Sequence, residues 1–225
     1  MKSLKFIQCL FIFATLSACT QDDGAEYTLF YGYNYIPLKV GMTNIYHVDS
    51  IIYDDFTGRI DTISFLQKEE VNSTFIDGSS KKAFRIEISE RLNDTSRWRV
   101  MRREVRLRTE LRYETQEDNV REIRLVFPVE ENKRWDANAL NAANKQEYEY
   151  ESVHGFFEFG NLQFDSSLHV IQRDEENLIE RFYTEERYAS GKGLIYRRDI
   201  NLRTKLNGEI EKGFVYTKYF LRSTP

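Results

Sequence analysis

Apolar and polar residues alternate with a period of two along most of this chain. In one range, for example, Phe84, Ile86 and Ile88 are separated by Arg85 and Glu87. Successive side chains of a β-strand point to opposite faces of a sheet, so this alternation predicts strands with one buried face. The pattern predicts strands at residues 44–53, 60–70, 83–91, 97–112, 120–129, 147–153, 162–172, 178–189, 193–205 and 209–222.

Turn-forming residues separate most of these ranges. Asn207-Gly208 lies between two of them, and Asn-Gly between alternating runs is the strongest short signal of a β-hairpin. Residues 54–58 and 76–79 are rich in Asp, Gly or Ser, which also favour turns. Short turns between successive strands predict an antiparallel sheet.

Two of the ranges contain an irregularity. Within 97–112 the apolar residues change parity once, which predicts a β-bulge between Met101 and Val105. The range 178–189 also has the spacing of an amphipathic helix, so a helix is the alternative there.

Alternation stops between residues 128 and 145. Residues 136–144 contain four alanines, a composition typical of helix. This segment is predicted to form a short helix or a structured loop, with Trp135 and Leu140 packed against the sheet.

The first 19 residues have a different character. Lys2 and Lys5 precede an apolar run over residues 6–16, which is followed by small residues and Cys19. This is the pattern of a secretory signal peptide, and a run this short cannot span a hydrocarbon core, which needs about 20 residues. Residues 1–18 are therefore predicted to be a signal peptide that is removed.

Leu16-Ser17-Ala18-Cys19 resembles the lipobox of bacterial lipoproteins. The resemblance implies cleavage before Cys19 and attachment of acyl chains such as palmitate, which would anchor the protein to a membrane. Because Cys9 lies in the removed segment, the mature chain would hold no other thiol and no internal disulfide. Thr20 directly after the cysteine implies delivery to the outer membrane, on its periplasmic face or on the cell surface.

The remaining chain is predicted to form a tether over residues 19–36 and one β-rich domain over residues 37–225. About 207 residues remain after cleavage, with no Pro-, Gly- or Ser-rich linker among them. The chain has 14 Tyr and 16 Phe, and aromatic residues fit half-buried sheet. The expected fold is mainly β: a single antiparallel β domain forming a barrel or half-barrel, or alternatively a β-sandwich, with one or two short helices.

The charge of the chain and its side-chain chemistry limit the classes of partner and of site that the sequence supports. Removal of the leader leaves 30 basic and 36 acidic residues, a balance that argues against a nucleic-acid partner. The three histidines lack metal-ligand spacing, and no serine lies in a nucleophile motif. We therefore expect no metal, no cofactor and no catalytic residue, and the protein is not expected to be an enzyme.

Basic residues are concentrated between residues 97 and 112. In one interpretation these arginines pair with glutamates across strands, including the later Glu147, Glu149 and Glu151, on a solvated face. In the other, Arg102, Arg106 and Arg108 bind an anionic component of the cell envelope, because a guanidinium fits phosphate and carboxylate. The seven arginines are Arg97, Arg99, Arg102, Arg103, Arg106, Arg108 and Arg112.

A group of aromatic residues allows two interpretations as well. Such a group is usually core, but in a half-open barrel it could line an apolar cavity for an acyl chain. Its members are Tyr148, Tyr150, Phe156, Phe157, Phe159 and Phe164.

Residues 35–46, 53–58 and 188–194, with other shorter segments, resemble a family of uncharacterised lipoproteins of the Bacteroidota. The resemblance covers most of the mature chain and implies no activity. Two tripeptides, centred on Ser50 and Thr62, are similar to the O-glycosylation signal of exported proteins in that phylum. Ser50 and Thr62 would be the acceptors of the glycan. The similar segments are residues 35–46 (YIPLKVGMTNIY), 49–50 (DS), 53–58 (YDDFTG), 125–128 (LVFP) with Trp135 and Asn138, and 188–194 (YASGKGL).

Together these observations favour a non-catalytic, lipid-anchored lipoprotein of the cell envelope that binds a ligand or supports an envelope assembly. The first alternative is a carrier of a lipid or other apolar ligand, similar to lipocalins or periplasmic lipoprotein carriers. The second is a glycan hydrolase, which would need two carboxylates in one cleft. Its partners are expected to be the membrane, through the lipid on Cys19, and an unidentified envelope ligand or protein.

Overall fold

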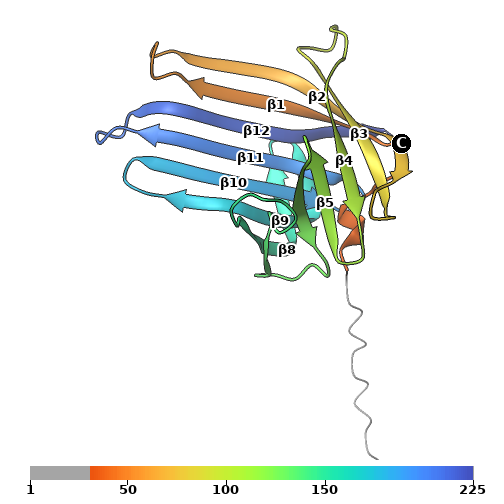
Figure 1. The fold of residues 1–225 in the computed structure, drawn as a ribbon. Coiled ribbons are helices and arrows are strands. Elements are labelled where there is room, and N and C mark those ends of the chain that lie inside the picture. Colours follow the sequence, from red (N-terminus) through yellow and green to blue (C-terminus); the bar gives the residue numbers. More distant parts are fainter. Residues whose placement is uncertain (1–30, 225) are drawn as a thin grey trace, which may run out of the picture.

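The computed structural model describes residues 31–224, so the predicted signal peptide, Cys19 and residues 19–30 of the tether lie outside the described residues. Twelve strands form one sheet in which every neighbouring pair is antiparallel, in the order β6-β5-β4-β3-β2-β1-β12-β11-β10-β9-β8-β7 (Figure 1). The strands are β1 (Thr43–Tyr53), β2 (Ile60–Ile76), β3 (Lys82–Arg91), β4 (Arg99–Arg108), β5 (Arg112–Glu117), β6 (Val120–Val126), β7 (Arg134–Asp136), β8 (Glu147–Phe159), β9 (Leu162–Glu176), β10 (Glu180–Ala189), β11 (Gly193–Thr204) and β12 (Ile210–Thr224).

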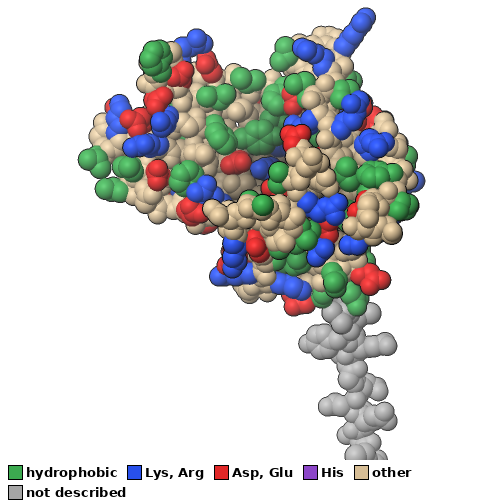
Figure 2. Space-filling view, in the orientation of Figure 1, with side chains coloured by type: hydrophobic (Ala, Val, Ile, Leu, Met, Phe, Trp, Pro, Cys, Tyr) green, Lys and Arg blue, Asp and Glu red, His purple; other side chains and the backbone are tan. Residues whose placement is uncertain are grey.

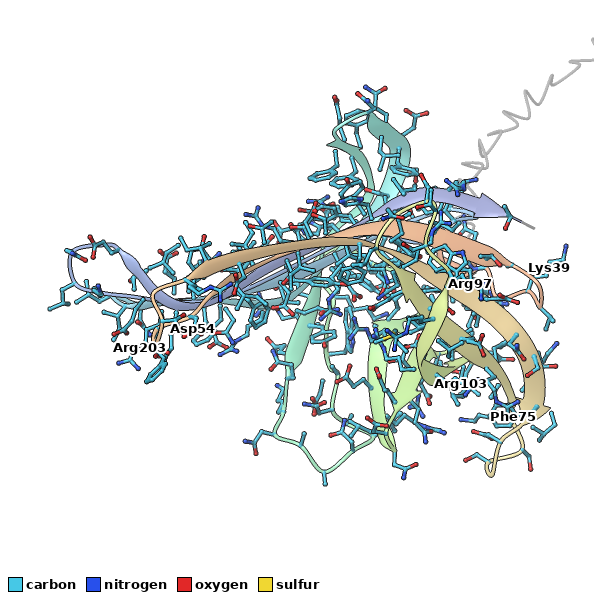
Figure 3. All side chains as sticks on the ribbon, turned by 90° about the horizontal axis from the view of Figure 1, so that it is seen from above. Lys39, Asp54, Phe75, Arg97, Arg103 and Arg203 are labelled. Atoms are coloured by element: carbon cyan, nitrogen blue, oxygen red, sulfur yellow. The ribbon has the colours of Figure 1, made fainter. Side chains whose placement is uncertain are left out.

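The sheet curls into a nearly closed barrel, which confirms the predicted mainly β, antiparallel fold and selects the barrel over the sandwich. The sheet extends away from the closed part toward Asp54 and Arg203, and it bends sharply on the side that carries Arg103 and Phe75 (Figure 3). Among residues 31–224 the helical content is one short 3-10 helix, η1 (Tyr33–Tyr35). No helix in this part of the chain has the length and apolar character needed to cross a membrane.

One local prediction needs correction. Residues 97–112 do not form a single strand: β4 ends at Arg108, and Thr109, whose backbone N–H donates to the carbonyl of Arg112 (2.9 Å), begins a turn that leads into β5. Residues 178–189 contain the expected strand, β10, rather than the alternative helix, and residues 137–144 form a loop of turns, which selects the structured loop over the short helix.

The predicted bulge lies at Met101. Arg102 pairs with Ile88 and Val100 pairs with Ser89, so two neighbouring positions of β3 face three of β4. Residues 102, 104 and 106 therefore share one face of the sheet, which is the inner face of the barrel.

The two ends of the sheet meet along a seam between β6 and the β7–β8 pair. Trp135 Nε1 donates a hydrogen bond to the carbonyl of Ile123 (2.9 Å), and the Ile123 N–H donates to the carbonyl of Ala137 (2.9 Å). The Tyr150 hydroxyl donates to the Val126 carbonyl (2.6 Å) and accepts from the Val126 N–H (2.9 Å). These contacts cover backbone groups of β6 that a sheet edge would otherwise expose.

The main hydrophobic core fills one end of the barrel beside this seam. Tyr35 and Ile36 are 0% and 3% exposed, so the N-terminal segment closes this end. The packed part of the chain thus includes residues 33–36, which the sequence assigned to the tether. The buried members of the core are Tyr35, Ile36, Tyr113, Ile123, Leu125, Phe127, Val129, Trp135, Ala137, Tyr148, Tyr150, Leu168, Val170 and Tyr188, with Leu140 packed against them.

Candidate functional site

A cavity of about 550 Å³ opens on the inner face of the barrel. In the space-filling view the surface is hollowed between two lobes, with apolar and charged side chains at the bottom of the hollow (Figure 2). Six basic and seven acidic side chains line the cavity. They are Arg102, Arg106, Arg124, Lys192, Arg197 and Lys218, with Glu69, Glu90, Glu104, Glu117, Glu122, Glu186 and Asp199.

The first ion cluster consists of Glu69 on β2, Glu104 and Arg106 on β4, and Lys218 on β12. Arg106 Nη2 binds Glu69 Oε2 at 2.6 Å, and the Arg106 Nε donates to Glu104. Lys218 binds the other oxygen of Glu69 and donates to Gln67 Oε1 at 2.8 Å. Glu69 and Lys218 side chains are only 4% and 6% exposed, so each buried charge is compensated by a direct partner.

Burial and the neighbouring charges together determine the pKa values of Glu69 and Lys218. Burial opposes the charged form of Glu69, but the Arg106 guanidinium and the Lys218 ammonium outweigh burial and lower the pKa of Glu69. Burial lowers the pKa of Lys218, and the attraction of Glu69 compensates for this only in part. Glu69 is therefore a carboxylate at neutral pH.

The second ion cluster is centred on Glu186 of β10. Arg197 Nη1 binds Glu186 Oε1 at 2.9 Å, Arg124 binds the same oxygen, and the Tyr188 hydroxyl donates to Oε2 at 2.5 Å. Burial would raise the pKa of Glu186, but Arg124 and Arg197 hold it below its ordinary value. Arg124 also binds Glu122 at 3.0 Å.

The carboxylates at the centres of the two ion clusters lack one property of a glycan hydrolase. Such enzymes need a carboxylic acid whose pKa is raised so that it can donate a proton near neutral pH. The two buried carboxylates at the cluster centres, Glu69 and Glu186, have lowered pKa values. Neither fits the role of the general acid.

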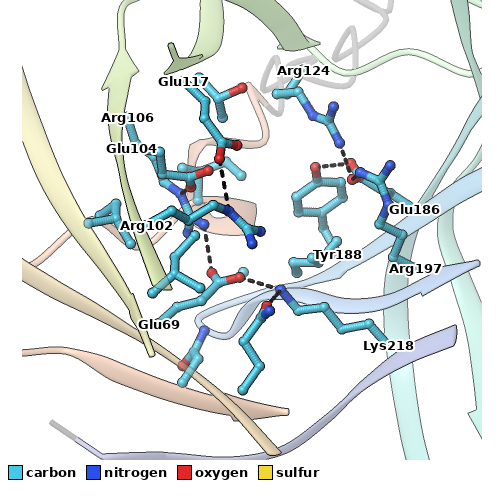
Figure 4. A pocket seen from close by; sticks show the side chains of 18 of the residues that line it. Glu69, Arg102, Glu104, Arg106, Glu117, Arg124, Glu186, Tyr188, Arg197 and Lys218 are labelled. Carbon is cyan, nitrogen blue, oxygen red and sulfur yellow. Dashed lines mark hydrogen bonds and ion pairs between the residues drawn. The ribbon is translucent and has the colours of Figure 1, made fainter. Parts of the chain in front are cut away.

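Arg102 is the arginine most open to the cavity. Its Nε binds Glu117 Oε1 at 3.0 Å, and the two side chains are 42% and 44% exposed. The two terminal nitrogens of Arg102 point into the cavity, and they make no hydrogen bond with any residue in 31–224 (Figure 4). The aromatic side chains of Phe65, Phe214 and Tyr216 line the same cavity.

The three arginines of the predicted anionic-ligand patch have different positions. Arg102 and Arg106 both line the cavity, but Arg106 is held between Glu69 and Glu104. Arg108 Nη1 donates to the backbone carbonyls of Tyr33 (3.0 Å) and Ile36 (3.2 Å), so it fixes the N-terminal segment.

The predicted pairing with the glutamates of residues 147–151 involves a different arginine. Arg134 binds Glu149 at 2.9 Å and Glu147 at 3.4 Å. Three arginines of β4, Arg102, Arg103 and Arg106, bind Glu69, Glu87, Glu104 and Glu117 instead.

None of the six aromatic residues grouped by the sequence lines this cavity. Tyr148 and Tyr150 belong to the main core. Phe157 and Phe159 contact Tyr196 on the outer face of the sheet, with ring centroids 5.3 and 5.0 Å apart. The wall of the cavity mixes apolar side chains with thirteen charged ones, whereas an acyl chain would need a mainly apolar wall.

The two predicted glycosylation acceptors lie on opposite faces of the β1–β2 pair. Ser50 lines the cavity and is half-buried, whereas Thr62 is exposed on the outer face. In residues 31–224, no group of three or more His, Cys, Asp and Glu side chains is arranged to hold a metal ion.

Comparisons with known proteins give two structural likenesses. No family model matches the chain, and no curated protein matches it in sequence. A protein of Bacteroides fragilis, described as exported and as having a YmcC-like fold, is 10% identical with a TM-score of 0.45. A protein of Parabacteroides distasonis, described as a lipoprotein, is 9% identical with a TM-score of 0.34. Each likeness covers 84% of this chain and 98% of the other chain.

Proposed function

We propose that this protein is a non-catalytic, lipid-anchored binding protein of the bacterial outer membrane whose barrel cavity binds a small polar ligand. The observation that carries the proposal is the cavity of about 550 Å³ with charged side chains on its wall. Its volume lies within the range of small-molecule sites, about 300–1,000 Å³. Arg102 gives this cavity hydrogen-bond donors that no described residue occupies.

The charged wall favours a polar ligand over a lipid. An acyl chain gains about 0.8 kcal/mol for each CH₂ group only where it leaves water for an apolar environment. Much of this wall consists of Arg, Lys, Glu and Asp side chains. A lipid chain against them would leave polar groups without water, which costs free energy.

The anchor rests on the resemblance of residues 16–19 to a lipobox. Intact mass spectrometry of protein extracted from membranes should show cleavage before Cys19 and the added mass of acyl chains. Cys19→Ser should abolish the added mass and release the protein from the membrane fraction. An unmodified Cys19 in the wild type would contradict the anchor.

Ligand binding is tested by native mass spectrometry of the full mature protein purified from its own membranes. A small polar molecule should copurify with the wild type. Ser50→Trp, which fills part of the cavity wall, should lose it. Thr62→Trp is the matched control, because Thr62 lies on the neighbouring strand but is exposed on the outer face.

The contrast between these two variants is decisive. A molecule that stays bound to Ser50→Trp and Thr62→Trp alike would not occupy the cavity. That result, or the absence of any copurified molecule from the wild type, would contradict the proposed function.

A further inference from the structure

We infer that the ligand carries a carboxylate group that binds the terminal nitrogens of Arg102, beside the Nε group that Glu117 holds. The inference rests on the proposed function, because it names the chemical class of ligand for the same cavity. It follows from a comparison of the four arginines that line this cavity.

Three of these arginines are already engaged by carboxylates. Arg106 binds Glu69 and Glu104, and Arg124 binds Glu122 and Glu186. Arg197 binds Glu186 and Asp199. Their fixed partners leave them little capacity to bind an incoming anion.

Arg102 has one ion-pair partner, whereas each of the other three arginines has two. Its one ion pair uses Nε, so the edge that carries the two terminal nitrogens is open toward the cavity (Figure 4). Parallel donors on a guanidinium edge match the two oxygens of a carboxylate in a bidentate pair. Because Arg102 and Glu117 are both more than one-third exposed, their ion pair contributes little stability and leaves Arg102 able to bind a second carboxylate.

Tyr216 supplies a further donor in the same cavity, which Arg102 and Tyr216 both line. Burial raises the pKa of Tyr216 to about 12, so its hydroxyl is protonated at neutral pH. The hydroxyl forms no hydrogen bond with a residue in 31–224 and can donate to a ligand oxygen.

The charge balance of the cavity favours a carboxylate over a phosphate. The wall already holds seven acidic and six basic side chains. A dianion would add a second negative charge to a wall on which acidic side chains already outnumber basic ones. Phe65 and Phe214 line the cavity as well and provide apolar surface for a ring or short chain on the same ligand.

The experiment uses matched probes that differ in charge. Phenylacetate, the neutral phenylacetamide and phenyl phosphate are titrated against the full mature protein, and binding is followed by ligand-observed NMR. Phenylacetate should bind at least tenfold more tightly than either other probe. Arg102→Gln should remove this preference, whereas Glu117→Gln should strengthen phenylacetate binding because it removes a negative charge beside the ligand carboxylate.

Arg103→Gln is the control, since Arg103 binds Glu87 at 3.0 Å and is 61% exposed away from the cavity. It should bind phenylacetate as the wild type does. Thermal unfolding of both arginine variants separates a loss of binding from a loss of folding. A weaker affinity in a folded Arg102→Gln variant together with a stronger affinity in Glu117→Gln cannot be explained by a purely structural role of Arg102.

Other outcomes would overturn the inference. If phenylacetate and phenylacetamide bind equally and Ser50→Trp abolishes both, the cavity binds ligands without recognising a carboxylate, and the proposed function stands. Tighter binding of phenyl phosphate would assign the site to phosphates. If no probe binds, the carboxylate assignment fails, and the copurification experiment decides the proposed function separately.

Discussion

Replacement of Glu69 by Gln tests the physical account of the first ion cluster. Glu69 binds Arg106 and Lys218 and is almost completely buried, and Gln has nearly the same shape without the charge. Loss of one partner from a buried ion pair costs about 3–5 kcal/mol. Arg106 retains Glu104, and Lys218 can lose its proton, so we expect the lower end, about 3 kcal/mol.

The assay is thermal and urea unfolding followed by circular dichroism. For a domain of about 150–250 residues, a loss of about 3 kcal/mol lowers Tm by about 6–12 °C. Glu70→Gln is the matched control on the same strand, because Glu70 pairs with Lys68 at 2.9 Å and is 36% exposed. Such a pair contributes about 0–1 kcal/mol. Equal losses in the two variants would refute the reasoning from burial.

The pH dependence gives an independent check of the same cluster. The pKa of Glu69 is lowered in the folded protein relative to its ordinary value of 4.5. Its contribution to the free energy of unfolding is therefore complete above about pH 4.5 and is lost as pH falls through the lowered pKa. The stability difference between wild type and Glu69→Gln should shrink below pH 4.5, and a constant difference would contradict the assignment.

Further predictions concern the core, a tight position in the sheet and modification. Tyr35→Ala should lower the free energy of unfolding by about 3–5 kcal/mol in urea titrations, because the fully buried ring closes one end of the barrel. Gly213→Ala should prevent soluble expression, since a Cβ there would lie 1.9 Å from a backbone carbonyl oxygen of β11. Gly58→Ala, at an open position with positive φ, should cost only about 1 kcal/mol and express normally. If the protein is glycosylated, Thr62→Ala should remove the glycan mass in intact mass spectrometry and Ser50→Ala should not, because the Ser50 side chain faces the cavity.

The alternation of apolar and polar residues was sufficient to predict most of the sheet. The strand expected at residues 44–53 is β1 (Thr43–Tyr53), and the parity change near Met101 marks a real bulge. Alternation shows which side chains of a strand share a face, and it depends only on residues that are close in sequence. It could not divide residues 97–112 into two strands, because the turn between them contains no Gly or Pro.

The alternation of apolar and polar residues could not predict the cavity. Charged residues that share a face of a strand are typical of a solvated surface, and periodicity does not tell whether a sheet closes around that face. Lys218 and Glu69 are separated by 149 positions, so no local pattern pairs them. One signal was present in the sequence: Lys218 shares its strand face with Tyr216 and Phe220, a position where a buried side chain is expected.

The seam beside Trp135 determines how this barrel can vary in shape. In a barrel closed by a continuous ladder, the number of strands and their stagger together fix the diameter. Here the hydroxyl of Tyr150 and the indole of Trp135 supply several of the contacts that join β6 to the opposite end of the sheet. Side chains, together with the backbone hydrogen bond from Ile123 to Ala137, therefore set the position of β6 along this line. Substitutions at these two aromatic positions should change the width of the cavity while leaving the hairpins of the sheet in place.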